Sequence, residues 1–280
     1  MGDEEQLTAV QGSALELAPF QGRILPDYHT PSFLDAIKDC SALLQDPACK
    51  ILEESRNRVG MIRVSLGDGG TLDVVIKEFR TRGLDKLKSG FQKSKARKAW
   101  LGSTALHGAG LETARPVAYL EKRGPVFLQQ SFFLAEHISG AREIRFLFRE
   151  LPPDALEPLV RELAAYLSQC RWLGILHRDL SDGNILVKKD GDGRYRFFLL
   201  DTNRIRLKRK IGPVRGIKNV IRLGLPREFR RSFLAWYLRS PRAGGWQWLW
   251  YRMSKSGYTG FVAFKRALKL KTIVRKLKIQ

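Results

Sequence analysis

The eight residues HRDLSDGN, from His177 to Asn184, combine a carboxylate and a carboxamide at a spacing that suits phosphate chemistry. Phosphoryl transfer needs a carboxylate that orients the acceptor hydroxyl and takes its proton, together with oxygen ligands for Mg²⁺ on the phosphates. A tight loop from Asp179 to Asn184 can supply both. Asp179 is therefore the predicted catalytic base and Asn184 a predicted magnesium ligand.

A second magnesium ligand is expected from an Asp at the end of a nearby strand. Asp201 in LLDTN lies 22 residues after Asp179, and one predicted hairpin fills the gap. Carboxylate and amide oxygens are the ligands that Mg²⁺ prefers. His177 is assigned to the structure of the loop, whereas Ser181 and Asp182 either reach the substrate or shape the turn. The alternative is a purely structural role in which Asp179 only caps a turn.

The sequence before the loop predicts the helices and strands that can position these residues. RNRVGMIRVSL and TLDVVIKEF flank the turn GDGG and predict a hairpin over residues 55–79. Apolar spacing predicts a helix over residues 84–110, strands over 114–121 and 126–135, and an amphipathic helix after Pro153 that Asp154 can cap. Residues 1–50 read as an irregular lead-in with a helix near residues 32–44.

Composition sets limits on the kind of protein. With 280 residues, 44% of them hydrophobic, the chain can form one two-lobed domain or two small ones. Three cysteines without a CxxC pair argue against a disulfide framework and against structural zinc. The formal charge of +22 predicts an anionic partner, which leaves nucleic acid, a membrane face or a phosphorylated glycan.

The catalytic residues resemble those of protein-kinase-like enzymes. His177, Arg178, Asp179 and Asn184 match the catalytic loop of that group, and Asp201 stands where it has the magnesium-binding Asp. The resemblance implies an α+β, two-lobed protein-kinase-like fold with a β-rich N-lobe and an α-rich C-lobe. It also implies that Lys77 in VVIKEF steadies the phosphates of ATP.

Several features depart from the protein-kinase pattern. Thr-Asn follows Asp201 in place of Phe-Gly, and no APE segment is present. No GxGxxG occurs either, so SRNRVG with the single glycine Gly60 is expected to cover the nucleotide. The helix that normally offers a Glu to the strand lysine has no acid, which leaves Glu112, Glu121 or Glu136 as substitutes, or a different orientation of Lys77.

These departures, with the stretches KSKARKAW, GLETARPVAYLEKRG, SFFLAEHISGA and LLDTNRIR, resemble the lipopolysaccharide core kinases over residues 56–238. The resemblance implies transfer of the ATP γ-phosphoryl group to a heptose or Kdo hydroxyl of a lipid-linked glycan, with Mg²⁺, at the cytoplasmic face of the inner membrane. Arg204 and Arg206, just past Asp201, are placed to meet an anionic acceptor, although structural ion pairs are an equal alternative.

The positive charge is concentrated in the C-terminal part. From Asp201 to Gln280, 13 Arg and 9 Lys face only Asp201 and Glu228, which gives a formal charge of +20. We expect this surface to favour the anionic acceptor and peripheral contact with an anionic membrane. Residues 261–280 could form a basic amphipathic helix with Phe261, Phe264, Leu268 and Ile273 facing lipid, or a helix packed on the C-lobe.

The predicted organisation is an N-terminal extension over residues 1–50, a nucleotide-binding N-lobe over 51–145 and a catalytic C-lobe over 146–280. An acid-containing N-terminus without an apolar core argues against export. Two other functions remain open. One is a kinase for a protein or a soluble small molecule, and the other is an inactive kinase-like anion-binding module. RNA binding would rest on charge alone and is disfavoured.

Overall fold

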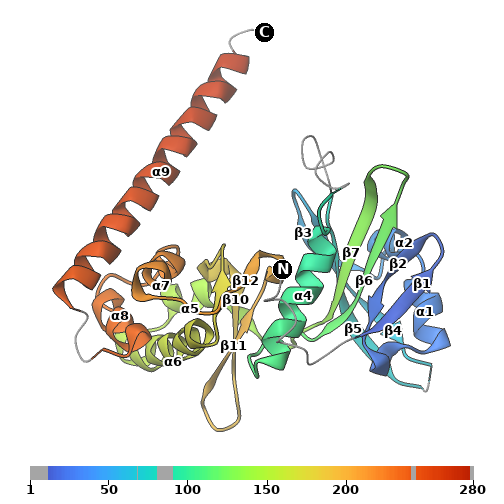
Figure 1. Ribbon diagram of the computed structural model, residues 1–280, viewed down its shortest axis with the longest axis horizontal. Coiled ribbons are helices and arrows are strands. Elements are labelled where there is room, and N and C mark those ends of the chain that lie inside the picture. Colours follow the sequence, from blue (N-terminus) through green and yellow to red (C-terminus); the bar gives the residue numbers. More distant parts are fainter. Residues whose placement is uncertain (1–11, 68, 81–90, 241–243, 278–280) are drawn as a thin grey trace. The chain divides into compact units, whose positions relative to one another are not determined.

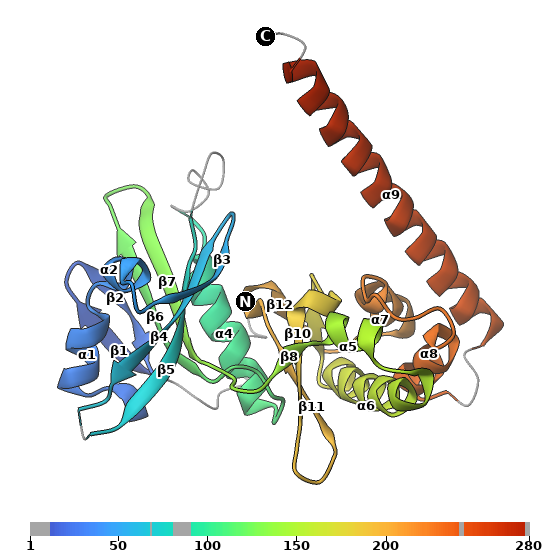
Figure 2. The ribbon, with the colours of Figure 1, turned by 180° about the vertical axis from the view of Figure 1, so that it is seen from behind.

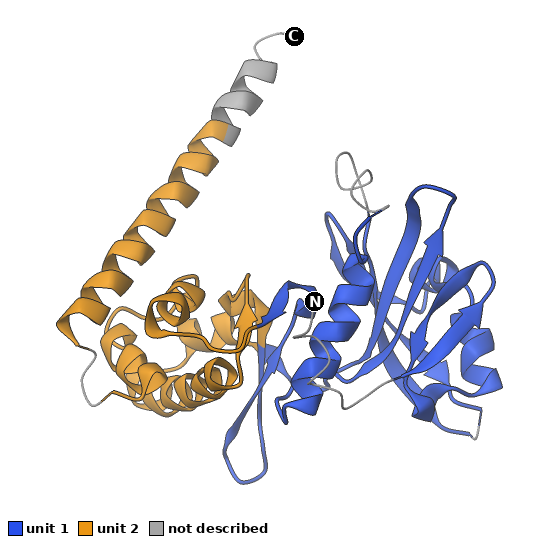
Figure 3. Cartoon of the chain, in the orientation of Figure 1, with its two compact units in different colours: residues 1–142, 186–207 blue, residues 143–185, 208–280 orange. Residues whose placement is uncertain are grey.

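The computed structural model divides into two compact units, each made of two separate stretches of the chain (Figures 1 and 3). It describes residues 12–67, 69–80, 91–240 and 244–277, with side chains up to residue 268. Unit 1 contains residues 1–142 and 186–207, and unit 2 contains residues 143–185 and 208–280. Unit 1 carries the large sheet and unit 2 is mainly helical, so the predicted α+β class is confirmed.

Unit 1 is built on a seven-stranded sheet in the order β1-β2-β6-β7-β5-β4-β3, in which every neighbouring pair is antiparallel. Its strands are β1 (Ser13–Leu17), β2 (Phe20–Ile24), β3 (Lys50–Glu54), β4 (Arg58–Ser65), β5 (Thr71–Glu78), β6 (Pro116–Arg123) and β7 (Leu128–Glu136). The predicted hairpin over residues 55–79 is β4–β5, and the two strands predicted after it are β6 and β7.

The prediction of an irregular lead-in is wrong for residues 13–24. These residues form β1 and β2, and β2 pairs with β6 inside the large sheet. Leu15, Phe20 and Ile24 are buried, so this edge contributes to the core. The prediction failed because only three apolar residues face inward over the two strands, which leaves little alternation to detect.

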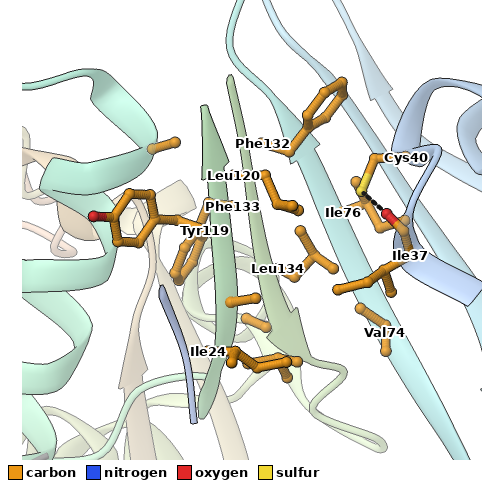
Figure 4. Close-up of a cluster of buried hydrophobic side chains, with 14 of the residues drawn as sticks. Ile24, Ile37, Cys40, Val74, Ile76, Tyr119, Leu120, Phe132, Phe133 and Leu134 are labelled. Atoms are coloured by element: carbon orange, nitrogen blue, oxygen red, sulfur yellow. Dashed lines mark hydrogen bonds between the residues drawn. The ribbon is translucent and has the colours of Figure 1, made fainter. Parts of the chain in front are cut away.

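The core of unit 1 lies on both faces of the sheet (Figure 4). On one face, Ile76 and Leu134 pack with Ile37, which belongs to the helical layer α1 (Pro31–Ile37) and α2 (Cys40–Gln45). On the other face, Tyr119 packs against Trp100 of α4 (Lys95–Gly108), with 5.8 Å between the ring centroids. Full burial of one large apolar side chain contributes about 1.5–3 kcal/mol, so this packing holds α4 against β6.

Helix α4 begins at a serine cap. The Ser94 hydroxyl oxygen accepts a hydrogen bond from the Arg97 N–H at 2.9 Å, and Gly110, with φ +67°, follows its end. Both signals are those that start and stop helices. Residues 84–90 of the longer predicted helix lie outside the described residues.

Unit 1 is completed by the second stretch of chain, which forms a hairpin of β10 (Ile185–Lys189) and β11 (Tyr195–Leu199) followed by short elements. The short elements of the chain are η1 (Pro26–Tyr28), β8 (Arg142–Glu143), β9 (Ile175–His177), η2 (Asp182–Asn184), η3 (Thr202–Arg204) and β12 (Ile205–Leu207). The β10–β11 hairpin was predicted, whereas β12 was not.

Unit 2 consists of α5 (Ile144–Glu150), α6 (Pro153–Trp172), α7 (Pro213–Val220), α8 (Arg230–Leu238) and α9 (Gly245–Leu277), the last seen clearly in Figure 2. The apolar face predicted for α6 is buried. Asp154 does not cap this helix, because Pro152 occupies the N-cap and Asp154 lies within the first turn. Among the described residues, no helix is both long and apolar enough to span a bilayer.

Candidate functional site

The loop from His177 to Asn184 lies in unit 2, directly after α6 and β9. Gly174 makes the entry turn with φ +72°, and a Cβ there would lie 1.8 Å from the Lys208 carbonyl oxygen. Only glycine fits this approach. The turn therefore aims the chain into the loop at a fixed angle.

Two hydrogen bonds hold the loop in shape. The Asp179 N–H donates to Nδ1 of the buried His177 at 3.2 Å, which supports the predicted structural role of His177. The Asn184 carboxamide Nδ2 donates to the Asp179 carbonyl oxygen at 2.8 Å. Because the amide nitrogen is engaged in the loop, the Asn184 Oδ1 oxygen is the atom left to bind a metal ion.

The Asp179 carboxylate has a partner that the sequence did not reveal. Arg222, two residues past the end of α7, forms an ion pair through Nη1 with the Asp179 Oδ1 oxygen. The side chains are 37% and 35% exposed, so both remain open to solvent on one side. The contact joins positions 43 residues apart and matches no motif, so nothing in the sequence singled out Arg222 among the C-terminal arginines.

Lys77 and Asp201 come together in unit 1. Lys77 lies on β5 opposite Val59 of β4 and Phe133 of β7, and its Nζ pairs with the Asp201 Oδ1 oxygen. The side chains are 18% and 30% exposed, which makes this contact more enclosed than the Arg222 pair. Lys77 therefore pairs with Asp201 and not with a glutamate, which agrees with the predicted alternative of a different orientation for Lys77.

The three glutamates that were considered as partners of Lys77 have other contacts. Glu112 pairs with Arg196, and Glu121 pairs with Arg123. Glu136 accepts a hydrogen bond from the Tyr28 hydroxyl. This bond and burial raise the pKa of Tyr28 well above its usual range, burial being the larger cause.

Asp201 adopts an uncommon backbone conformation immediately after the β10–β11 hairpin. Its φ is 52° and its ψ 43°, in the left-handed region that Asp enters more readily than most residues. Strand β11 ends at Leu199, two residues earlier than the prediction of a strand ending at Asp201. Uncommon backbone conformations of this kind occur often at functional sites.

Helix α4 anchors the segment that follows Asp201. The Thr202 hydroxyl donates to the Ala99 carbonyl oxygen at 2.9 Å and lies 3.0 Å from the Ser103 hydroxyl. A Cβ at Gly102 would lie 2.2 Å from the Thr202 carbonyl oxygen, so glycine is required for this approach. Thus α4, which lacks the usual glutamate, supports Asp201 through the backbone next to it.

Gly60 lies inside strand β4, paired with Ile76 of β5 and Ile51 of β3. A Cβ there would lie 2.5 Å from the Cys49 sulfur and 2.8 Å from the Leu44 side chain. Close packing therefore explains the glycine. A nucleotide-binding role for Gly60 stays a prediction.

Arg204 directly precedes strand β12 and Arg206 lies within it, shortly after Asp201. Arg204 is exposed at the end of η3, and its backbone N–H donates to the Asp201 carbonyl oxygen. The Arg206 Nη1 donates to the Ile205 carbonyl oxygen at 2.9 Å. A role of either guanidinium in binding the acceptor stays a prediction.

The donor chemistry fits magnesium. Asn184 of unit 2 and Asp201 of unit 1 carry an amide and a carboxylate oxygen, which are donor types that Mg²⁺ prefers, and a joint magnesium site stays a prediction. No cluster of three or more His, Cys, Asp or Glu side chains that could hold a metal occurs within the described part of the chain.

Comparisons with known proteins show the family of the chain. The profile of the lipopolysaccharide kinase (Kdo/WaaP) family matches residues 74–224, which include Lys77, Asp179, Asn184 and Asp201. The solved structure of WaaP in complex with acyl carrier protein matches 83% of this chain and 92% of its own, at 22% identity and a TM-score of 0.52. That likeness concerns the fold. No curated protein shows a significant match.

Proposed function

Because this chain belongs to the lipopolysaccharide kinase (Kdo/WaaP) family, we propose that it transfers the γ-phosphoryl group of ATP to a heptose or Kdo hydroxyl of the lipopolysaccharide inner core. Family membership supports a phosphotransferase that acts on a core sugar. ATP as donor, magnesium and the identity of the sugar are the finer parts of the proposal.

The observation that carries the proposal is the ion pair between Lys77 and Asp201, 124 positions apart in the chain. A phosphate-binding lysine and a metal-binding carboxylate have to act on the same phosphate groups, and each is partly exposed. Both lie in the region that the family profile matches. A purely structural ion pair would not be expected to join the two residues that the kinase motifs single out independently.

In the proposed reaction each side chain has one task. Asp179 accepts a hydrogen bond from the acceptor hydroxyl, the sugar oxygen forms a bond to the γ-phosphorus, and the bond from that phosphorus to the β–γ bridging oxygen breaks. The hydroxyl proton passes to the Asp179 carboxylate and ADP leaves. Lys77 would bind the phosphates, and Asn184 and Asp201 would hold Mg²⁺, whose positive charge would offset the negative charge on the phosphate oxygens.

A transfer assay with γ-labelled ATP tests this function. The wild-type protein is incubated with isolated inner-core lipopolysaccharide, with casein and with an aminoglycoside. Label is expected in the lipopolysaccharide only, and Asp179→Ala should reduce the rate by about 10²–10⁴. Labelling of casein or of the aminoglycoside in preference to the glycan would assign the enzyme to another class of kinase.

We also propose that the protein meets its acceptor from the cytoplasmic side of the inner membrane. Helix α9 exposes an apolar stripe made of Trp246, Leu249, Met253, Phe261, Phe264 and Leu268, each 48–63% exposed. At 3.6 residues per turn these positions fall on one side of the helix, opposite Tyr251, Lys255 and Tyr258, which pack inward. An apolar stripe within a strongly basic region suits the surface of an anionic bilayer.

A further inference from the structure

We propose that Arg222 is the acceptor-selecting residue of this enzyme, which binds an oxyanion, a carboxylate or a phosphate, next to the hydroxyl that receives the phosphoryl group. The inference rests on the proposed function for the identity of Asp179 as the base. It adds a residue that no motif of the sequence marks.

The first observation is the contact with Asp179. Arg222 engages one carboxylate oxygen, Oδ1, through one guanidinium nitrogen, Nη1. The hydroxyl that Asp179 orients needs only one oxygen, so Oδ2 is left for it. Arg222 and the reacting hydroxyl would therefore bind the two oxygens of the same carboxylate. This places Arg222 where it can also contact the acceptor.

The second observation is the donor capacity of Arg222. A guanidinium has five N–H donors, and the described part of the chain gives Arg222 only Asp179 as an ionic partner and the Tyr258 ring as a stacking partner. The side chain is 37% exposed. The remaining donors can bind a planar oxyanion in two parallel hydrogen bonds, the geometry that favours arginine over lysine.

The third observation is that the segment carrying Arg222 is fixed from both sides. The Lys255 Nζ of α9 donates to the carbonyl oxygens of Ile221 at 2.9 Å and Leu223 at 2.8 Å, the two residues that flank Arg222. The Tyr258 ring lies 5.2 Å from the Arg222 guanidinium carbon. An arginine whose backbone and side chain are both held loses less entropy when it binds a ligand.

The same segment packs closely on the catalytic loop at a second point. A Cβ at Gly224 would lie 2.5 Å from the Asp182 Oδ2 oxygen, so glycine lets the chain pass directly over the loop. Residues 221–225 thus lie beside Asp179 and Asp182, and Arg222 is the positively charged residue of this segment. Arg222 is therefore held in a defined position in which it can bind an anionic group. A solvated arginine on the surface would not be held in this way.

The test measures binding separately from catalysis. In the intact protein labelled with ¹⁵N-arginine, the Arg222 Nε–H signal is assigned by its loss in Arg222→Lys. It should shift when dephosphorylated inner-core oligosaccharide, which keeps its Kdo carboxylates, is added, and it should not shift with the same oligosaccharide after carboxyl reduction. Phosphorylated but carboxyl-reduced oligosaccharide shows whether a phosphate serves as well. A signal that moves equally with the neutral oligosaccharide, or with none of them, overturns the proposal.

Kinetics give the matching expectation. Arg222→Ala and Arg222→Lys should raise the KM for the charged acceptor by about tenfold or more, since a charge-assisted hydrogen bond contributes about 1.5–3 kcal/mol, while the KM for ATP stays the same. Arg215→Ala removes the same charge from an exposed position on α7 and is the control. Equal loss on charged and neutral acceptors would mean that Arg222 only supports the loop, against the proposal. If wild type transfers nothing to the glycan, the proposed function fails, and the spectra still decide whether Arg222 binds the oxyanion.

Discussion

Lys77 shows how far single residues could be interpreted from the sequence. Its identity as a candidate phosphate ligand follows from a short local pattern, VVIKEF, and Asp179 and Asn184 follow from another. The partners of these residues do not, because Asp201 and Arg222 reach them from distant positions. A motif reflects only the local spacing of residues, whereas an ion pair between distant positions depends on how the chain folds.

Replacing Lys77 by methionine should weaken ATP binding while the protein stays folded. The substitution keeps the length of the side chain and removes the charge-assisted contacts to phosphate, which are worth about 1.5–3 kcal/mol. The KM for ATP should rise about tenfold or more, since about 1.4 kcal/mol corresponds to a factor of ten. Steady-state kinetics at saturating acceptor measure the change, and Lys188→Met, at an exposed position on β10, is the control. An unchanged KM for ATP would remove Lys77 from the nucleotide site.

At the scale of elements, helix α4 illustrates both the success and the limit of sequence analysis. Its existence follows from apolar spacing, whereas its start at the Ser94 cap is known only from the structure. Its role does not, because a helix without a glutamate gives no sign that it supports Asp201 through Thr202. The glycine that permits this approach, Gly102, looks in the sequence like a weak point of the helix.

Gly102→Ala should destabilise the protein. Alanine is favoured over glycine in a helix by about 1 kcal/mol, but the new Cβ would lie 2.2 Å from the Thr202 carbonyl oxygen, and overpacking of this kind costs about 1–3 kcal/mol. The clash is with backbone and should prevail, so thermal unfolding should occur at lower temperature. Gly257→Ala, in α9 with no atom within 4 Å of the new Cβ, should be neutral or stabilising. Equal effects of the two substitutions would contradict the packing argument.

Lys255 gives α9 a pH-dependent contribution to stability. Burial is the main cause that lowers its pKa to about 8; Arg230 also lowers it, and Asp182 raises it. The unfolded value is about 10.4, so between these two values the unfolded chain binds more protons at this residue. The free energy of unfolding contributed by Lys255 should therefore rise as the pH increases from about 8 toward 10.

Urea unfolding of wild type and Lys255→Met across this pH range measures the effect. The wild-type protein should gain stability relative to the variant as the pH rises, because the buried ammonium loses its proton. Wild type and Lys255→Met share all other titrating groups. The difference between their free energies of unfolding therefore isolates the contribution of Lys255. A difference between the two proteins that stays constant from pH 8 to pH 10 would refute the lowered pKa.

At the scale of the molecule, the order of lobes could be predicted but the exact division could not. A β-rich first part and a helical second part are readable in the hydrophobic patterns. The return of residues 186–207 to unit 1 is not, because the hairpin that makes the crossing has the same local pattern in either unit. The contribution of β1 and β2 to the sheet was missed for the reason given above.

The apolar stripe of α9 should bind anionic vesicles. Each Lys or Arg near such a surface contributes about 1 kcal/mol, and the contribution falls with salt. In vesicle flotation, wild type should float with vesicles that contain anionic lipid at low salt and less at high salt. The double variant Phe261→Ser with Phe264→Ser should float less, whereas Phe91→Ser, 95% exposed and outside α9, should behave as wild type. Flotation that ignores both salt and the double substitution would exclude the stripe as the membrane contact.

The most direct test of the central claim is a magnesium titration of phosphoryl transfer. If Asn184 and Asp201 hold one metal ion on the nucleotide that Lys77 and Asp179 serve, Asn184→Ala and Asp201→Asn should each raise the magnesium concentration needed for half-maximal rate. Asp192→Asn, at an exposed turn residue, should leave it unchanged. The same magnesium requirement in wild type and in both variants would contradict the account.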